Sequence, residues 1–593
     1  MAVSNRTGVN AHPRQPVIDV IITPGLAEET LSRTRAHGRH AHDTPELTAL
    51  AERRASRIRA LLAIAVMGLA FLSVGGQLIR VAMKGQSQQQ IAMSAPIATA
   101  FARPDIVDRN GRLLAGDIVM QSLIADPSAV LDVDEIVAKL RKVFPEVNPD
   151  RIREALADRS KKFAWLRRGM SDAEAELINH QGLPATDFRP ELRRSYPLGR
   201  TAGHVLGFVD IDNKGLAGIE AYLDSREKVE PVHGPSLSAR PPLRLSIDIA
   251  VQYAIEEELA DSMRRYQAKA ASGIVMDANT GAILAAASLP ALDPGNVDER
   301  FEKTRIDRLT SGTYELGSIF KTITLAMSLD SGKVRPDSVI DVTKQLEVDG
   351  YPIRDLHPPG RPLTVGEIFL KSSNVGAALL ALAEGPDNQN AFLTRLGLTT
   401  PMATEAGAVA APSLPARWGD IETVTIAYGH GLAVAPIQFA AAGAALVNGG
   451  YKVTPTFLRD SRNADQPGTT VRHRVIRPET SRAIGEMMLA NVASGAGTGT
   501  RARVPGISVG GKTGTAEIAG AGGYRDRSVI SSFFAAFPME NPRYVSLVSL
   551  YEPKGTTETG GEITAGRNAA PATSRIIARI APLLGLLAEQ NAD

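Results

Sequence analysis

One segment constrains this chain more than any other: residues 60–79 form an apolar stretch of 20 residues without a charged side chain. At about 1.5 Å per residue, a helix of that length spans a hydrocarbon core about 30 Å thick. Only Arg80 and Lys84 follow the stretch closely, whereas four arginines precede it: Arg53, Arg54, Arg57 and Arg59. Because positive loops stay on the cytoplasmic side, this asymmetry predicts a cytoplasmic N-terminus and a C-terminal bulk in the periplasm.

Two alternatives compete with a transmembrane helix over residues 60–80. A cleaved signal peptide normally has an apolar region of about 7 to 15 residues and a short charged leader, and neither matches this chain. A buried helix of a soluble domain fits least, because such helices seldom have so long a charge-free run. We therefore expect an uncleaved membrane anchor. Residues 1–59 lack sustained periodicity and are predicted to form a disordered cytoplasmic tail, which we favour over a metal-binding tract.

The composition excludes several classes of protein. A length of 593 residues predicts roughly three to five structural units. The 66 basic and 64 acidic side chains leave a net charge of +2, which gives no field suited to holding nucleic acid. The absence of cysteine excludes disulfide frameworks, iron–sulfur sites and thiol nucleophiles.

The part of the chain after the anchor divides at a linker rich in proline and charge, residues 225–242. Before it, residues 85–225 mix short strand-like runs, such as Ser122–Ala125, with charged helical segments, such as Val133–Val143. This pattern predicts an extended domain of mixed structure.

After the linker, apolar runs near both ends of one long region predict five strands, with helices between them. The expected strands are 272–277, 281–288, 507–518, 528–537 and 544–551, and the flanking helices are 249–267, capped by Asp248, and 568–587. Strands that come together from both ends of a domain predict an α/β (α+β) fold, an antiparallel sheet covered by helices.

Ser318 and Lys321 are the first candidate catalytic pair. Residues three apart on a helix lie on one face, about 5 to 6 Å between Cβ atoms, so the amine can take the hydroxyl proton. Ser318 follows a glycine turn and opens an apolar helical run, where backbone N–H groups can hold an oxyanion. Ser225 and Lys228 have the same spacing in the linker, and a helix N-cap is the ordinary alternative for Ser318.

Ser372 and Asn374 form a second polar pattern inside the mostly apolar run 368–382. Buried polar side chains need partners, so this triplet predicts a site or a loop between helices. Ser461 and Asn463 repeat the pattern in a polar segment that we interpret as a surface loop.

Residues 506–515 (GISVGGKTGT) satisfy three different rules. A phosphate-binding loop needs a strand before it and a helix after it, and the flanking residues favour neither. A nucleophile elbow around Ser508 needs a later histidine, but the last one is His473. On a strand, Lys512, Thr513 and Gly514 supply a cation, a hydroxyl and room for a ligand backbone. No histidine pair has a carboxylate placed to complete a catalytic metal triad, so we predict no metal and no cofactor.

Taken in order, Ser318-x-x-Lys321, Ser372-x-Asn374 and Lys512-Thr513-Gly514-Thr515 resemble the three signatures of penicillin-binding proteins and serine β-lactamases. Residues 103–115 and 194–222 resemble the pedestal of the class B, monofunctional transpeptidases, and residues 418–438, 523–538 and 568–571 resemble their division-specific branch. The resemblance extends from about residue 50 to 590. Leu316, in place of proline, and Pro104, in place of glycine, depart from the family pattern and alter turns only.

The resemblance implies a pedestal (dimerisation) domain over 85–242 and a transpeptidase domain over 243–593. It implies that Ser318 attacks the D-alanyl-D-alanine end of a peptidoglycan stem peptide, with Lys321 as base, and that β-lactam antibiotics acylate the same serine. Other implied roles are a proton relay through Ser372 and Lys512, a substrate contact from Asn374, carboxylate binding by Thr513 and Thr515 beside Gly514, and an oxyanion hole of the Ser318 and Thr515 N–H groups.

The resemblance also places the enzyme at the division septum, as a single-pass protein of the bacterial inner membrane. No polymerase-sized region precedes the pedestal, which implies a polytopic membrane glycosyltransferase and other division proteins as partners. Two alternatives stay open at this point. One is a membrane-tethered nucleotide hydrolase using Lys512 and Thr513, and the other is a division scaffold that has lost activity.

Overall fold

The computed structural model describes residues 57–80, 103–226, 241–296, 298–459, 473–520 and 523–586. They belong to two compact units, Met1–Ser94 and Ala95–Asp593, which are described separately. Among its described residues, the first unit contains one helix, Arg57–Arg80, which is 24 residues long and apolar, and none of its residues is buried. Its length suffices to cross a membrane, and it covers the predicted span 60–80. The predicted tail lies outside the described residues, apart from residues 57–59.

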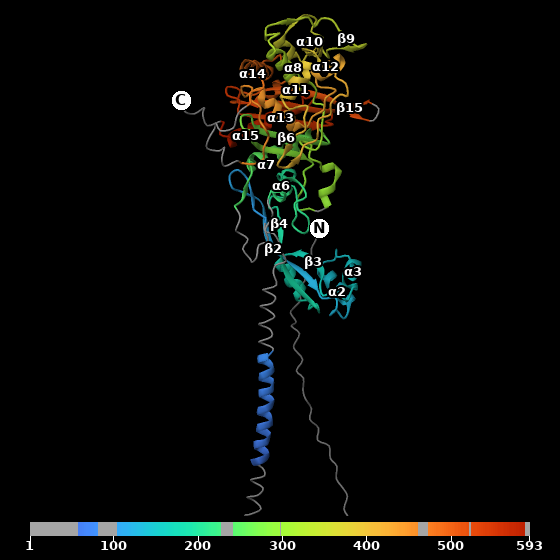
Figure 1. Cartoon of the computed structure of the whole chain (residues 1–593), viewed down its shortest axis with the longest axis vertical. Helices are drawn as coiled ribbons and strands as arrows, with labels where there is room; N and C mark the ends of the chain where they lie inside the picture. Colours follow the sequence, from blue (N-terminus) through green and yellow to red (C-terminus); the bar gives the residue numbers. More distant parts are fainter. Residues whose placement is uncertain are drawn as a thin grey trace, which may run out of the picture. The chain divides into compact units, whose positions relative to one another are not determined.

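The second unit begins with a small mixed sheet (Figure 1). Its longest strand, β2 (Leu113–Ala125), pairs antiparallel with β1 (Ile106–Val107), β3 (Ala164–Met170) and β4 (Thr186–Ser195). The short β5 (Leu243–Arg244) lies parallel beside β1. The strand predicted at Ser122–Ala125 is therefore confirmed as the end of β2.

Five helices accompany this sheet. α2 (Val133–Val143), α3 (Pro149–Ala157) and α4 (Asp172–Asn179) share a small apolar core with β2 and β3. α2 has the predicted bounds, because the Asp132 side chain accepts hydrogen bonds from the first N–H groups and starts the helix. The chain continues into α5 (Gly203–Leu206) and α6 (Gly218–Arg226).

A buried network of ion pairs holds β2, β4 and α6 together. Glu220 of α6 accepts from Arg103 at 2.9 Å and from Arg194 at 2.7 Å, and Arg194 also lies 3.2 Å from Asp117. All four side chains are at most 3% exposed. Charges removed from water in this way must stay paired, so the network fixes one arrangement of these three elements.

Five antiparallel strands form the larger sheet, in the order β14-β15-β16-β6-β7. Their bounds are β6 (Ala270–Asp277), β7 (Ile283–Leu289), β14 (Gly510–Gly520), β15 (Gly523–Phe537) and β16 (Tyr544–Tyr551). The predicted sheet is confirmed, including the pairing of strands from both ends of the domain. Both faces are apolar because helices cover both faces.

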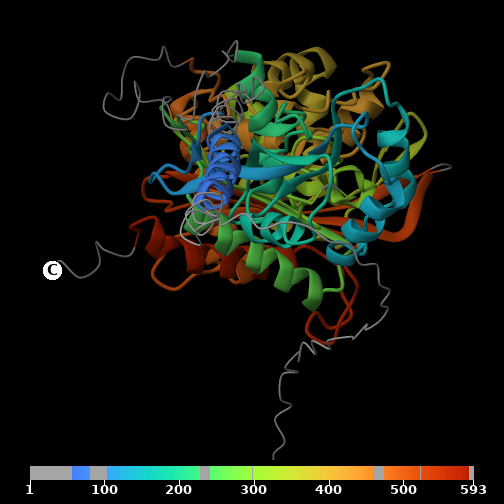
Figure 2. The ribbon, with the colours of Figure 1, turned by 90° about the horizontal axis from the view of Figure 1, so that it is seen from below.

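Two helices cover one face of this sheet, α7 (Ile249–Arg265) and α15 (Ala569–Leu583). They run side by side in Figure 2, and Arg575 of α15 pairs with Glu258 of α7 at 3.2 Å. Asp248 caps α7 as predicted.

The opposite face packs against α8 (Lys321–Asp330) and α13 (Pro436–Ala445). Gly443 allows α13 to approach the sheet, since a Cβ there would lie 2.4 Å from the Phe534 ring.

The other elements lie between β7 and β14, where the sequence predicts a helical region. The short helices are η1 (Asp298–Phe301), η2 (Lys303–Arg305), η3 (Gly317–Phe320) and η4 (Thr500–Ala502). The α-helices are α9 (Val365–Lys371), α10 (Asn374–Glu384), α11 (Pro386–Arg395), α12 (Asp420–Ala427) and α14 (Pro478–Ala493). The small strands are β8 (Val339–Ile340), β9 (Leu346–Val348), β10 (Tyr351–Ile353), β11 (Leu363–Thr364), β12 (Ala403–Thr404) and β13 (Gly407–Ala408).

Some predicted bounds differ from the structure by a few residues. Ile507 belongs to a turn, where its N–H donates to Val504 O, so β14 begins at Gly510 instead. β15 begins at Gly523, five residues early, because the hairpin pairing continues to Gly520. In the predicted linker, Ser225 and Arg226 still belong to α6, and residues 227–240 lie outside the described part.

Candidate active site

Ser318 lies in η3 directly after Gly317, a position that accepts only glycine. Gly317 has φ +57°, and a Cβ there would lie 2.6 Å from the carbonyl oxygen of Thr515. The serine is therefore held directly against β14. Ser318 does not cap the helix, since Leu316 occupies the cap position and no side chain makes a capping bond there. Its hydroxyl remains available for chemistry.

Lys321 begins α8, and its side chain is fully buried. Its Nζ has four polar neighbours, namely Ser318 Oγ at 3.1 Å, Ser372 Oγ at 3.1 Å, Asn374 Oδ1 at 2.7 Å and the Ser372 carbonyl oxygen at 2.6 Å. The pair predicted from spacing is thus in contact, and the second motif meets the same nitrogen.

The chemistry of these neighbours determines how a neutral Lys321 is oriented. The Ser372 carbonyl and the Asn374 amide oxygen can only accept hydrogen bonds, so they take the two N–H groups of a neutral amine. The lone pair then remains for a hydroxyl proton, from Ser318 or Ser372. Burial lowers the pKa of Lys321 well below its usual range, the nearby Lys512 lowers it further, and Asp355 opposes both.

Ser372 and Asn374 stand at the junction of two helices, as the polar triplet predicts. α9 ends at Lys371 and is followed by Ser372 as its C-cap, whose φ of +56° is left-handed, and Ser373 caps α10 by accepting from Gly376 N at 2.9 Å. The Asn374 amide is held from both sides, because its Nδ2 donates to Arg354 O at 3.1 Å while Oδ1 accepts from Lys321. This fixes the orientation of the amide.

Lys512 points inward from β14 and is fully buried. Its Nζ has one long hydrogen bond, to Thr513 O at 3.4 Å, and lies 5.8 Å from the centre of the Phe369 ring. Burial lowers the pKa of Lys512 to about 7. Gly514 follows at a close approach, since a Cβ there would lie 2.4 Å from Leu316 O. Lys512 therefore supplies a charge that responds to pH near neutrality.

Thr513 and Thr515 present hydroxyls on the other face of β14. Thr515 Oγ1 accepts from Ala565 N at 3.1 Å, so its proton remains available for a ligand. Thr513 Oγ1 lies 2.7 Å from Thr498 Oγ1. Asn491 of α14 supports both segments, because Nδ2 donates to Gly511 O at 2.8 Å and Oδ1 accepts from Thr498 N at 3.0 Å.

A cavity of about 830 Å³ opens along this arrangement. The residues from all three motifs that line it are Ser318, Ser372, Asn374, Thr513 and Thr515. Lys321 and Lys512 lie buried beside it. The structure thus brings together every predicted site residue.

Several residues of the site escaped the sequence analysis. Asp355 is the most important, because it binds the second motif: its carboxylate accepts from Ser373 Oγ at 2.7 Å, from Val375 N at 3.1 Å and from Asn374 N. Further residues line the cavity, among them Tyr428, His430, Thr498, Arg501 and Glu517. Glu517 could have been found from the sequence. A strand presents every second residue on the same face, and Glu517 follows Thr513 and Thr515 in that series.

The phosphate-binding loop and the nucleophile elbow that residues 506–515 suggested are not the sites that the structure forms. Lys512 and Thr513 lie inside an antiparallel strand, not in a loop that precedes a helix, which excludes a phosphate-binding loop. Ser508 hydrogen-bonds Glu540 and the N–H of Met539. Residues 227–228 and 461–463, which complete the two repeated patterns, lie outside the described residues. Within the described residues no three metal-binding side chains form a cluster.

Comparison with known proteins agrees with this geometry. The family model of the penicillin binding protein transpeptidase domain matches residues 271–577, and that of the penicillin-binding protein dimerisation domain matches residues 99–228. The probable peptidoglycan D,D-transpeptidase FtsI of Caulobacter vibrioides is 36% identical, covering 94% of this chain and 92% of the relative.

Two further relatives extend the comparison. The peptidoglycan D,D-transpeptidase FtsI of Escherichia coli is 29% identical over 78% of this chain and 81% of its own length. The transpeptidase domain of penicillin-binding protein 3 from Burkholderia pseudomallei superposes with a TM-score of 0.51 at 32% identity, covering 60% of this chain and 98% of that domain. The chain therefore belongs to the penicillin-binding protein transpeptidases, in the FtsI-type class B group that combines a dimerisation domain with a transpeptidase domain.

Proposed function

We propose that the chain is a serine-type peptidoglycan D,D-transpeptidase that cross-links stem peptides at the division septum. Ser318 attacks the carbonyl between the two terminal D-alanines, the C–N bond breaks, and D-alanine leaves behind an acyl-enzyme ester. An amine of a second stem peptide then takes the acyl group and frees the serine. β-Lactams acylate the same hydroxyl. The names of the curated relatives and the matching family support this reaction.

Lys321 acts as the base for the attack. Its lowered pKa favours the neutral amine, and its two N–H groups are engaged by acceptors, so the lone pair can receive the Ser318 proton at 3.1 Å. The resulting ammonium is buried and lies near Lys512, and both features favour its rapid deprotonation.

Ser372 carries this proton to the leaving amine. Its Oγ lies 3.1 Å from Lys321 Nζ and lines the cavity, so one hydroxyl can accept from the lysine and donate to the leaving nitrogen. In the second half-reaction, the same path in reverse removes a proton from the attacking amine.

The β14 residues bind and polarise the substrate. The hydroxyls of Thr513 and Thr515 hold the terminal carboxylate, with the charge of Lys512 behind them. The N–H groups of Ser318 and Thr515 form the oxyanion hole, where one donor contributes about 3 kcal/mol to the transition state. Asn374, fixed from both sides, hydrogen-bonds the substrate amide.

One observation carries this proposal, namely the contact of Lys321 Nζ with Ser318 Oγ, Ser372 Oγ and Asn374 Oδ1. The test is intact mass spectrometry of the full-length protein in detergent after incubation with a penicillin. The wild type should gain one adduct and Ser318→Ala none, while Ser508→Ala, at the rejected elbow, should react as the wild type does. An adduct that persists in Ser318→Ala would rule out the assigned nucleophile.

The membrane arrangement belongs to the same proposal. Helix Arg57–Arg80 anchors the chain in the inner membrane, with residues 1–59 in the cytoplasm and the catalytic domain in the periplasm. Arg53 and Arg54 before the helix, with Arg57 and Arg59 in its first turn, support this orientation. A reporter that is active only in the periplasm, fused after Asp593, should be active, and activity of a cytoplasmic reporter alone would reverse the orientation.

Domain bounds and partners complete the proposal. Residues 85–242 form the pedestal and 243–593 the transpeptidase domain, which the ranges of the two family matches support. Neither matched family is a glycosyltransferase, so glycan strands would come from a polytopic membrane glycosyltransferase that binds this chain together with other division proteins. Loss of co-purification of such a polymerase after deletion of residues 85–242 is the expected result.

A further inference from the structure

Glu517 stands in the catalytic cavity and has no role in the reaction described above. It follows Thr513 and Thr515 at every second position of β14, and all three side chains line the cavity. Glu517 is an exposed residue. Among the described residues none makes a hydrogen bond or an ion pair with it. A carboxylate in a substrate cavity that makes no hydrogen bond or ion pair with the described residues is available to a ligand.

The position of Glu517 along β14 indicates which part of the substrate it meets. β14 is the outer strand of its sheet, so an extended peptide can lie along it as a further strand. If Thr515 N–H holds the scissile carbonyl and Thr513 the terminal carboxylate, the peptide runs from Thr513 toward Glu517. Each residue advances about 3.4 Å, so Glu517 lies about 7 Å beyond Thr515. That distance places it beside the residue that precedes the two alanines.

The walls around Glu517 favour a long side chain with a positive end. Val529 lies directly across from Glu517 on β15 and also lines the cavity. The rings of Tyr428 and His430, 5.6 Å apart, line it as well. An aliphatic stem can pack on the valine, and a cation beside an aromatic ring and a carboxylate is attracted by both. Burial lowers the pKa of His430 more than the nearby carboxylates of Glu315 and Glu517 raise it, which favours an uncharged ring that does not repel a cation.

We propose that Glu517 determines donor specificity by pairing with a free ammonium group on the side chain that precedes the two D-alanines. The favoured donor is then a stem peptide with an unmodified diamino acid at that position. This inference rests on the proposed function, because it needs Ser318 and Thr515 to fix the peptide.

The test compares two synthetic peptides that end in D-alanyl-D-alanine and differ only before the alanines, one with lysine and one with Nε-acetyl-lysine. Each competes with a fluorescent penicillin for the full-length protein in detergent. We expect the lysine peptide to compete about fivefold better, as for an ion pair open to water, and less so at high salt. Glu517→Gln should abolish the difference and Glu517→Lys should reverse it, with the competition in each variant expressed relative to the penicillin labelling of that variant without peptide.

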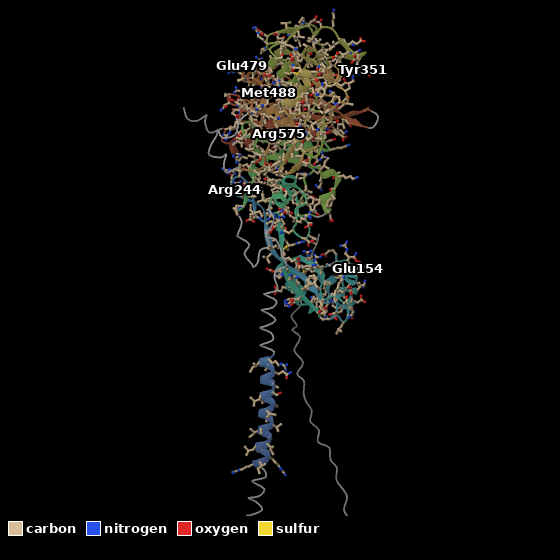
Figure 3. All side chains as sticks on the ribbon, viewed as in Figure 1. Glu154, Arg244, Tyr351, Glu479, Met488 and Arg575 are labelled. Atoms are coloured by element: carbon tan, nitrogen blue, oxygen red, sulfur yellow. The ribbon has the colours of Figure 1, made fainter. Side chains whose placement is uncertain are left out.

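Glu479→Gln is the matched control and should keep the wild-type preference. Glu479 lies on α14 and does not line the cavity, and Figure 3 shows it on the opposite side of the domain from Tyr351. An unchanged preference in Glu517→Gln, or no competition by either peptide, would overturn the inference. Normal penicillin labelling of the wild type in the same experiment would still support Ser318 as the nucleophile. A wild type that penicillin does not label would instead overturn the proposed function itself.

Discussion

The Ser373 hydroxyl donates a hydrogen bond of 2.7 Å to the carboxylate of Asp355, a residue outside the three motifs. The same carboxylate accepts from the N–H groups of Asn374 and Val375, the first two of α10, and so adds to the cap that Ser373 provides. Because Asn374 in turn binds Lys321, Asp355 positions the catalytic base through one intermediate residue.

We expect Asp355→Asn to slow penicillin acylation about tenfold and to shift its pH profile. Asn can accept at only one oxygen, so one or more of the three bonds is lost and Asn374 is held less firmly. The negative charge of Asp355 raises the pKa of Lys321, so its removal lowers that pKa and extends the acidic limb of the rate profile to lower pH.

Stopped-flow acylation between pH 5 and 9 measures both effects. The matched control is Asp337→Asn, which removes an exposed carboxylate paired with Arg335 and should change neither the rate nor the profile. A slower rate with an unmoved acidic limb would mean that Asp355 acts by geometry alone.

The stability of the enzyme should depend on Lys512 in a defined direction. The pKa of Lys512 is lowered to about 7, whereas an unfolded lysine titrates near about 10.4, so between these values the unfolded chain binds more protons. The free energy of unfolding therefore rises with pH across that window. Below pH 7 the folded protein keeps a buried charge with only one long hydrogen bond.

Lys512→Met removes this dependence. We expect the variant to be more stable than the wild type at pH 7, by on the order of 2 to 4 kcal/mol, with an advantage that shrinks toward pH 10. Thermal unfolding of both proteins at pH 7, 8.5 and 10 measures it. A stability difference that does not change with pH would contradict the lowered pKa. Because Lys512 belongs to the active site, acylation of the Lys512→Met variant should be strongly reduced at every pH.

Parts of this structure follow from short-range rules, and those parts were predicted well. The structure confirms the predicted bounds of α2, where the Asp132 side chain caps the start and the apolar positions repeat at helical spacing. The β6 and β16 strands were predicted because both faces are covered, which leaves continuous apolar runs. Bounds failed where hydrogen bonding across a hairpin decided them, as at Gly523.

Local rules predicted the site only where its residues lie close together in the sequence. Ser318 and Lys321 are three residues apart on one turn, so their contact follows from helix geometry. The contact of Lys321 with Asn374, 53 residues away, follows from no local rule and was expected only from resemblance. Asp355 lies in a segment rich in proline and glycine, typical of a loop, and its partners 18 to 20 residues later could not be identified without the fold.

Gly429→Ala should impair acylation by displacing Ser318. Gly429 has φ +95°, and a Cβ there would lie 1.9 Å from the Gly317 carbonyl oxygen, while the Gly317 N–H donates to Gly429 O at 3.2 Å. The alanine must push η3 away from its place beside β14, and we expect at least a 100-fold slower penicillin acylation.

Gly385→Ala separates this clash from backbone strain. Gly385 has φ +83°, and no atom lies within 4 Å of the position that a Cβ would take, so its alanine variant bears the backbone strain alone. It should lose about 1 to 2 kcal/mol of stability and keep its acylation rate. Equal acylation by the two variants would show that the Gly317–Gly429 contact does not position the serine.

Glu220→Gln should destabilise the pedestal without altering the chemistry. The carboxylate pairs with Arg103 and Arg194 in a region almost closed to water, and its loss leaves two buried guanidinium groups short of one negative charge. Removing one partner of a buried ion pair costs about 3 to 5 kcal/mol. Hydrogen exchange should therefore accelerate in β2, β4 and α6 but not in β14 or α8.

Asp134→Asn, which breaks an exposed pair with Arg153, should cost less than about 1 kcal/mol and leave exchange unchanged. Penicillin acylation of Ser318 should stay normal in both variants, because the network contacts none of the three motifs. Slower acylation in Glu220→Gln alone would instead show that the pedestal communicates with the active site.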